Sequence, residues 1–127
     1  MVGLQNVGYA TAWVLPRMID RERRLVLVPT SAGTKVDANG RVEVRAHGGE
    51  QHFEVGVDAA VSDGTTFIVM ANDEPAGAIT IAAGNGDLHL TNVGATLPHG
   101  IDPVDDLLSV EVTDGRGTVI LLGYFDF

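Results

Sequence analysis

The sequence predicts an all-β fold, an antiparallel β-sandwich of eight or nine strands with an N-terminal arm. Short runs rich in Val, Ile, Leu, Thr and Phe recur eight times, and the chain's 16 glycines punctuate them. Several runs alternate apolar and polar residues, as a strand with one buried and one wet face does. Dipeptides with turn chemistry separate many of the runs. A sandwich of jelly-roll or Ig-like shape is the architecture that this pattern favours.

The candidate strands follow one another at the spacing expected of an antiparallel sheet. We predict them at residues 25–30, 41–46, 51–58, 65–71, 76–82, 86–92, 107–113 and 118–125. Turns are expected at Asn39-Gly40, Gly48-Gly49, Asp63-Gly64, Asn85-Gly86 and Asp114-Gly115. The longest connection lies between the sixth and seventh strands and contains Pro98, Gly100 and Pro103. Such a loop crosses between sheets or covers an end, and it is the natural place for a binding surface.

Three of the predicted strands do not alternate. Residues 25–28, 67–70 and 119–122 are apolar at every position, so both faces of these strands are apolar. In an antiparallel sheet this pattern indicates that something also covers the outside. The sequence therefore predicts a covering element or a partner over these strands.

The first segment of the chain, Val2 to Leu15, is the best internal candidate for that cover. Gly3 and Gly8 interrupt it and Pro16 ends it, which favours an extended arm or a ninth strand over a helix. Its apolar residues, together with the bases that follow and the aromatic C-terminus, form the predicted interface. These residues are Val2, Leu4, Val7, Tyr9, Trp13, Leu15, Arg17, Arg21, Arg23, Arg24, Tyr124, Phe125 and Phe127.

The charges divide the chain into a basic and an acidic part. Residues up to Arg45 carry seven bases and four acids, whereas the remainder carries one base and thirteen acids. Opposite charges on two parts of one chain indicate that they meet, within a molecule or between copies. The segment from Arg17 to Arg24 is predicted to be a charged linker or one helical turn. We therefore divide the chain into an arm and basic linker, 1–24, and a β-sandwich domain, 25–127.

Length and composition exclude several classes of protein. A chain of 127 residues with 45% hydrophobic residues has the size and composition of one globular domain. The absence of cysteine excludes disulfides, thiolate metal sites and cysteine nucleophiles. A net charge of −9 argues against nucleic-acid binding. No signal peptide or transmembrane helix is visible, so a cytoplasmic location or a place in a larger particle is favoured.

The search for chemistry predicts no enzyme, metal or cofactor. His47 and His52 flank a predicted hairpin turn without a third ligand, so they are interpreted as a surface pair. His89 is expected on the face opposite its leucine neighbours, and His99 lies in the long loop. The acidic stretch Asp102 to Asp106 has loop oxygens that could hold calcium, but it does not match an EF-hand. No nucleophile, base and orienting group can be named together.

The sequence therefore predicts a non-enzymatic, acidic structural protein. In this hypothesis the protein self-associates as a homo-oligomer, or joins a larger assembly, by docking its arm onto a strand edge or an uncovered face. The last residues are consistent with such contacts, since alternation places Tyr124 opposite Phe125 and one side requires a cover. The alternative is a ligand-binding β-sandwich module that holds a carbohydrate or calcium in the loop at residues 93–106. Strand order, copy number and partner do not follow from the sequence.

Overall fold

The computed structural model describes residues 21–101 and 103–125, and this part of the chain is all-β. Eight antiparallel strands form one nearly closed sheet in the order β6-β5-β8-β9-β2-β3-β4-β7. They are β2 (Arg21–Pro29), β3 (Asn39–His47), β4 (Glu50–Asp58), β5 (Thr66–Ala71), β6 (Glu74–Thr80), β7 (Asn85–Thr91), β8 (Ser109–Thr113) and β9 (Val119–Tyr124). All eight predicted strands are present, with ends within two residues of prediction except at the start of β2.

The start of β2 corrects the prediction of a linker or helical turn for its described residues. Arg21 to Arg24 are strand, because they pair in register with β3 from Ala46 back to Glu43. Alternation along this strand sends Arg23 to the inner side and Arg24 to the outer side. The charged residues therefore belong to the sheet itself.

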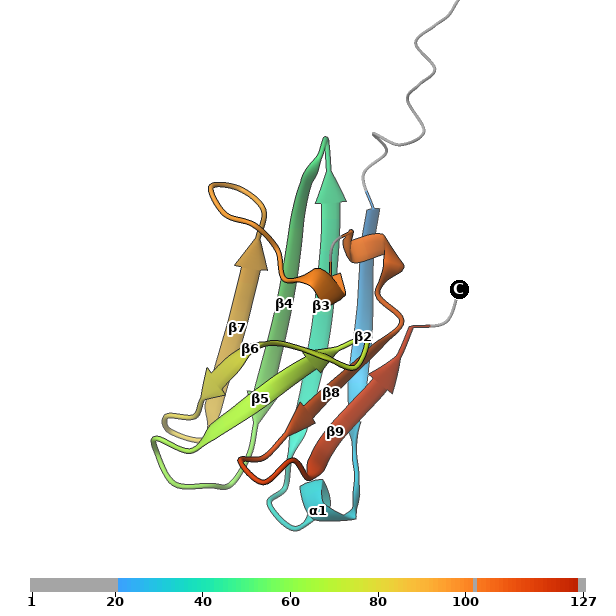
Figure 1. Ribbon diagram of the computed structural model, residues 1–127. Coiled ribbons are helices and arrows are strands. Elements are labelled where there is room, and N and C mark those ends of the chain that lie inside the picture. Colours follow the sequence, from blue (N-terminus) through green and yellow to red (C-terminus); the bar gives the residue numbers. More distant parts are fainter. Residues whose placement is uncertain (1–20, 102, 126–127) are drawn as a thin grey trace, which may run out of the picture.

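The sheet curves so that one half of its strands lies over the other half, with β2 between the two halves. Figure 1 shows β6, β5, β8 and β9 in front of β7, β4, β3 and β2. Residues 21–27 of β2 pair with β3, whereas Val28 and Pro29 pair with Leu122 and Leu121 of β9. The two end strands, β6 and β7, also approach closely, since a Cβ atom on Gly86 would lie 2.6 Å from the Thr80 carbonyl oxygen.

Three of the five predicted turns are turns, and two are strand starts. Gly48-Gly49, Asp63-Gly64 and Asp114-Gly115 lie in connections, and positive φ angles at Gly48 and Gly49 close the β3–β4 hairpin. Asn39-Gly40 and Asn85-Gly86 instead open β3 and β7. At these strand starts the glycine permits a close approach, because added Cβ atoms would meet neighbouring carbonyl oxygens under 3 Å away.

Helix in the described residues is confined to three short pieces. These are α1 (Ser31–Thr34), η2 (His99–Ile101) and η3 (Val104–Asp106). The longest has four residues, and none of them could span a lipid bilayer. The Thr30 hydroxyl caps α1 by accepting from the Gly33 N–H, and it donates to the Val119 carbonyl, so α1 is fastened to β9.

The core fills the inside of the curved sheet, and the long loop closes one end of it. Large side chains buried here include Phe53, Leu27, Ile79, Ile81 and Leu121. The loop at residues 92–108 buries four apolar residues in the same core: Leu97, Ile101, Val104 and Leu107. The Gln51 side chain accepts from the Val104 N–H at 2.7 Å, which ties η3 to β4.

Candidate functional site

Four apolar side chains lie together on the outside of β2 and β9. Val28 pairs directly with Leu122, so both side chains project from the same side of the sheet. Val26 precedes Val28 by two residues and Tyr124 follows Leu122 by two, so alternation places them on that side too. Val26 is 74% exposed, Val28 60% and Tyr124 65%, while Leu122 is half-buried. We call these four residues the apolar face.

The apolar face lies where the sequence predicted a missing cover. Within residues 21–101 and 103–125, nothing encloses Val26 or Val28, although both belong to a strand that is apolar on each side. A depression of about 380 Å³ adjoins Val26, and its walls come from β2 and β3. It is lined by Arg24, Leu25, Val26, Arg41, Val42 and Glu43. The exposed apolar surface therefore continues into a shallow groove.

Arg23, one base of the predicted interface, contacts the long loop and the C-terminal end of its own chain. Arg23 Nη2 donates to the Val104 carbonyl at 3.0 Å, and its guanidinium lies 4.6 Å from the centre of the Phe125 ring. Phe125 is buried, whereas Tyr124 points outward, as alternation predicted. Arg21 is exposed at the start of β2. The arm residues Val2, Leu4, Val7, Tyr9, Trp13 and Leu15, together with Arg17 and Phe127, lie outside the described residues.

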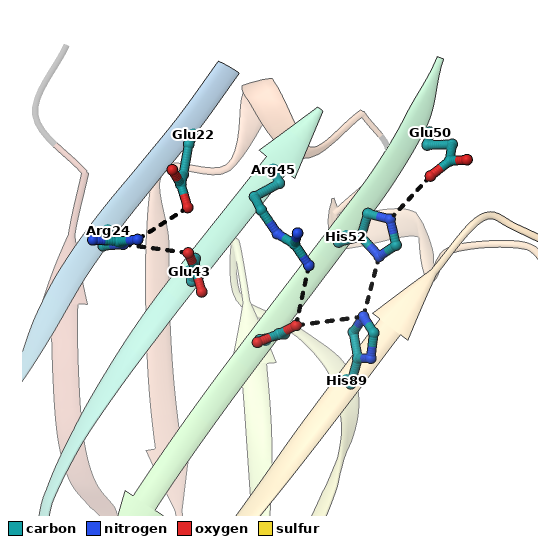
Figure 2. A network of polar contacts seen from close by, with 8 residues as sticks. Glu22, Arg24, Glu43, Arg45, Glu50, His52 and His89 are labelled. Carbon is teal, nitrogen blue, oxygen red and sulfur yellow. Dashed lines mark hydrogen bonds and ion pairs between the residues drawn. The ribbon is translucent and has the colours of Figure 1, made fainter. Parts of the chain in front are cut away.

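The outer face of β2, β3, β4 and β7 carries a network of polar side chains (Figure 2). Arg24 donates to Glu43 at 3.2 Å and to Glu22 at 3.1 Å. These two carboxylates raise the pKa of Arg24. A hydrogen bond with Glu22, aided by Arg24, lowers the pKa of Glu43 below its ordinary value of 4.5. Exposed pairs of this kind contribute little to stability.

Two histidines meet at the other end of this network, and we call them the histidine pair. His52 Nδ1 and His89 Nε2 are 3.1 Å apart, and the ring centres are 5.3 Å apart. Glu50 lies 3.4 Å from His52 Nε2, and Glu54 lies 3.6 Å from His89 Nε2. His89 faces outward, as predicted from its alternation with Leu88 and Leu90.

Sequence reasoning paired His52 with His47, and it missed the contact with His89. In the register of the hairpin, His52 lies opposite Arg45, while His47 lies opposite Glu50. His52 reaches His89 because β4 also pairs with β7, whose sequence comes after two intervening strands. Neither local alternation nor turn chemistry signals that pairing, so the sequence held no sign of this contact.

The loop proposed as a ligand cradle contributes to the core. Leu97, Ile101 and Val104 are buried and hold it against the end of the sheet, and the Asp106 carbonyl accepts from the Asn72 side chain. In the described ranges, which omit Asp102, no group of three or more His, Asp or Glu side chains is placed to hold a metal ion. His99 lies on the surface, 3.0 Å from Glu74.

Comparisons with known proteins do not assign a function, so the function is inferred from the described surface. The chain matches no protein-family model, no curated protein and no solved structure. Two features of the described surface remain as candidates for function. They are the apolar face on β2 and β9 and the histidine pair on β4 and β7.

Proposed function

We propose that the protein is a non-enzymatic structural subunit that self-associates through its apolar face. The observation that carries the proposal is the exposure of Val26, Val28 and Tyr124 in one block on the sheet. Monomeric proteins leave single apolar residues in water, but a contiguous group on regular strands favours a contact surface. Burying an exposed Val or Leu side chain contributes about 1.5–3 kcal/mol, so even a small block supports docking.

The occupant that we propose is the segment Val2 to Leu15 of a neighbouring copy. It is rich in apolar residues, and at about 3.3 Å per residue its 14 residues extend to roughly 46 Å. β2 runs from Arg21 toward Pro29, so the preceding chain joins the sheet at the end farther from Val28. To reach Val28 of its own copy the segment would have to reverse direction and pass back over β2. A neighbouring copy can receive it without that reversal.

Apolar contacts, more than charge, then supply the specificity. Arg23 and Arg24 contact groups of their own chain, so they support the acceptor surface rather than bind a neighbour. Arg17, which precedes β2 in the sequence, is the base that we expect to face an acidic acceptor, and Glu111 lies opposite Leu122 at the border of the apolar face. If each copy docks its segment onto the next copy in turn, the contact is heterologous and builds a ring or a filament.

We also propose that the strands are arranged as a β-sandwich of jelly-roll or Ig-like shape rather than a closed barrel. In support, β6 and β7 approach each other without a ladder of paired residues in the described part of the chain. β2 divides its pairing between the two halves of the sheet, and only its last two residues pair with β9. A shared strand of this kind is one way for a sandwich to join its sheets at a corner.

The test of self-association is the mass of the full chain in solution by light scattering. We expect an oligomer for the full chain and a monomer after deletion of residues 2–15 or after Val28→Lys. Asn85→Lys is the matched control, because it adds the same charge at an exposed strand position on β7 and should leave the mass unchanged. A monomeric full chain contradicts the proposal. An oligomer that survives the deletion contradicts the role of the segment.

A further inference from the structure

We propose that the histidine pair binds a divalent transition-metal ion of the class that prefers imidazole ligands, such as Ni²⁺, Cu²⁺ or Zn²⁺. The proposal is independent of self-association. Two nitrogens bound to one ion at about 2.0–2.1 Å lie about 2.9–3.4 Å apart for the usual angles between neighbouring ligands. His52 Nδ1 and His89 Nε2 are 3.1 Å apart. The pair thus has the spacing of two adjacent ligands.

The two rings present their nitrogens to each other rather than their faces. Their planes differ by 26°, and the 5.3 Å between ring centres is close to the nitrogen separation plus the two ring radii. This is the arrangement of an N–H···N hydrogen bond, in which one ring carries the proton and the other offers a lone pair. For a metal ion to take the place of that proton, each ring must turn by roughly 35–45° so that both lone pairs converge on the ion.

Two carboxylates near the histidine pair favour the binding of a cation there. Glu50 Oε1 lies 3.4 Å from His52 Nε2, so this carboxylate can hold the second ring proton and leave Nδ1 free as a ligand. Histidines that bind metals commonly donate their other N–H to a carboxylate in this way. Glu54 lies 3.6 Å from His89 Nε2, while it also contacts Arg45 at 3.4 Å. The described chain thus offers two nitrogen ligands, and water completes the coordination.

The position of the pair on neighbouring strands preorganises it. His52 lies on β4 and His89 on β7, and the strands are held in register from His52 to Asp58. The His52 side chain is only 19% exposed, which limits its freedom to turn away. Because β7 is the last strand in the sheet order, an ion held here cross-links that end strand to the rest of the sheet.

Isothermal titration of the full chain with Ni²⁺ and with Zn²⁺ tests this site. We expect one ion per chain, and His52→Ala or His89→Ala should each weaken the affinity at least about tenfold. His99→Ala is the matched control, since His99 is exposed beside Glu74 and should leave the affinity unchanged. Mg²⁺ should give no binding heat, because it prefers oxygen ligands. Bound Ni²⁺ should also raise the melting temperature, because it binds the folded state.

Two results would overturn the proposal. One is the absence of saturable binding of either transition metal to the full chain. The other is binding that both histidine variants retain, which would place the ion elsewhere. Melting curves without metal check that each variant is folded, since both substitutions lie on the outer face of the sheet.

Discussion

At the scale of the residue, Asp114 organises the turn that leads into β9. Its Oδ1 accepts the backbone N–H groups of Arg116 at 2.8 Å and Thr118 at 2.9 Å. The hydrogen bond from Thr118, followed by that from Arg116, lowers the pKa of Asp114 below its ordinary value of 3.8. The turn matters for function because β9 carries Leu122 and Tyr124 of the apolar face.

The lowered pKa predicts how Asp114→Asn changes stability with pH. A group whose pKa is lower in the folded protein stabilises it above the unfolded value, and this contribution is lost as pH falls through the folded value. The variant should therefore be less stable than the parent above about pH 4, with the difference closing at lower pH. Urea unfolding from pH 7 to pH 2.5 measures it. Asp87→Asn serves as control, because the Asp87 carboxylate accepts no hydrogen bond within the described residues. If the stability of the two variants depended on pH in the same way, the prediction would be wrong.

At the scale of the element, local sequence patterns predicted the strands but only part of what joins them. Alternation and apolar runs placed all eight strands, since each is a property of neighbouring residues. The expectation that dipeptides such as Asn-Gly form turns failed at Asn39-Gly40, where the glycine permits close packing. The same expectation missed the turn at Asn72-Asp73, where both residues have positive φ angles although neither is glycine. The pairing of β4 with β7, and with it the histidine pair, depends on contacts distant in sequence.

The long loop covers one end of the core, and Ile101 tests its role. Its Pro and Gly content predicted a connection that crosses between sheets or covers an end, and its spaced apolar residues close the core there. Ile101→Ala should lower the free energy of unfolding by about 2–5 kcal/mol, because Ile101 is fully buried. Val93→Ala in the same loop should change it by less than about 0.5 kcal/mol, since Val93 is 54% exposed. Equal effects in urea unfolding would show that the loop does not seal the core.

At the scale of the whole molecule, the basic and acidic parts of the sequence occupy different strands of the sheet. β2 and β3 carry most of the bases, and they lie in the middle of the sheet order with the acidic strands on both sides. The ion pair of Arg45 with Glu54 joins the two parts, whereas Arg24 pairs with Glu22 and Glu43 of its own part. The opposite charges that the sequence separates thus meet partly within one copy, which leaves the apolar face as the stronger basis for association.

The two candidate surfaces should act independently, because β3 and part of β2 separate them. Val28 lies at the junction of β2 with β9, whereas the histidine pair lies on β4 and β7 at the far side of β3. Substitutions more than about 7–10 Å apart with no shared partner usually have additive effects. Val28→Lys should therefore leave the Ni²⁺ affinity unchanged, and His52→Ala should leave the mass in solution unchanged. If Ni²⁺ instead raised the mass of Val28→Lys, the ion would bridge copies, and the histidine pair would belong to the contact between subunits.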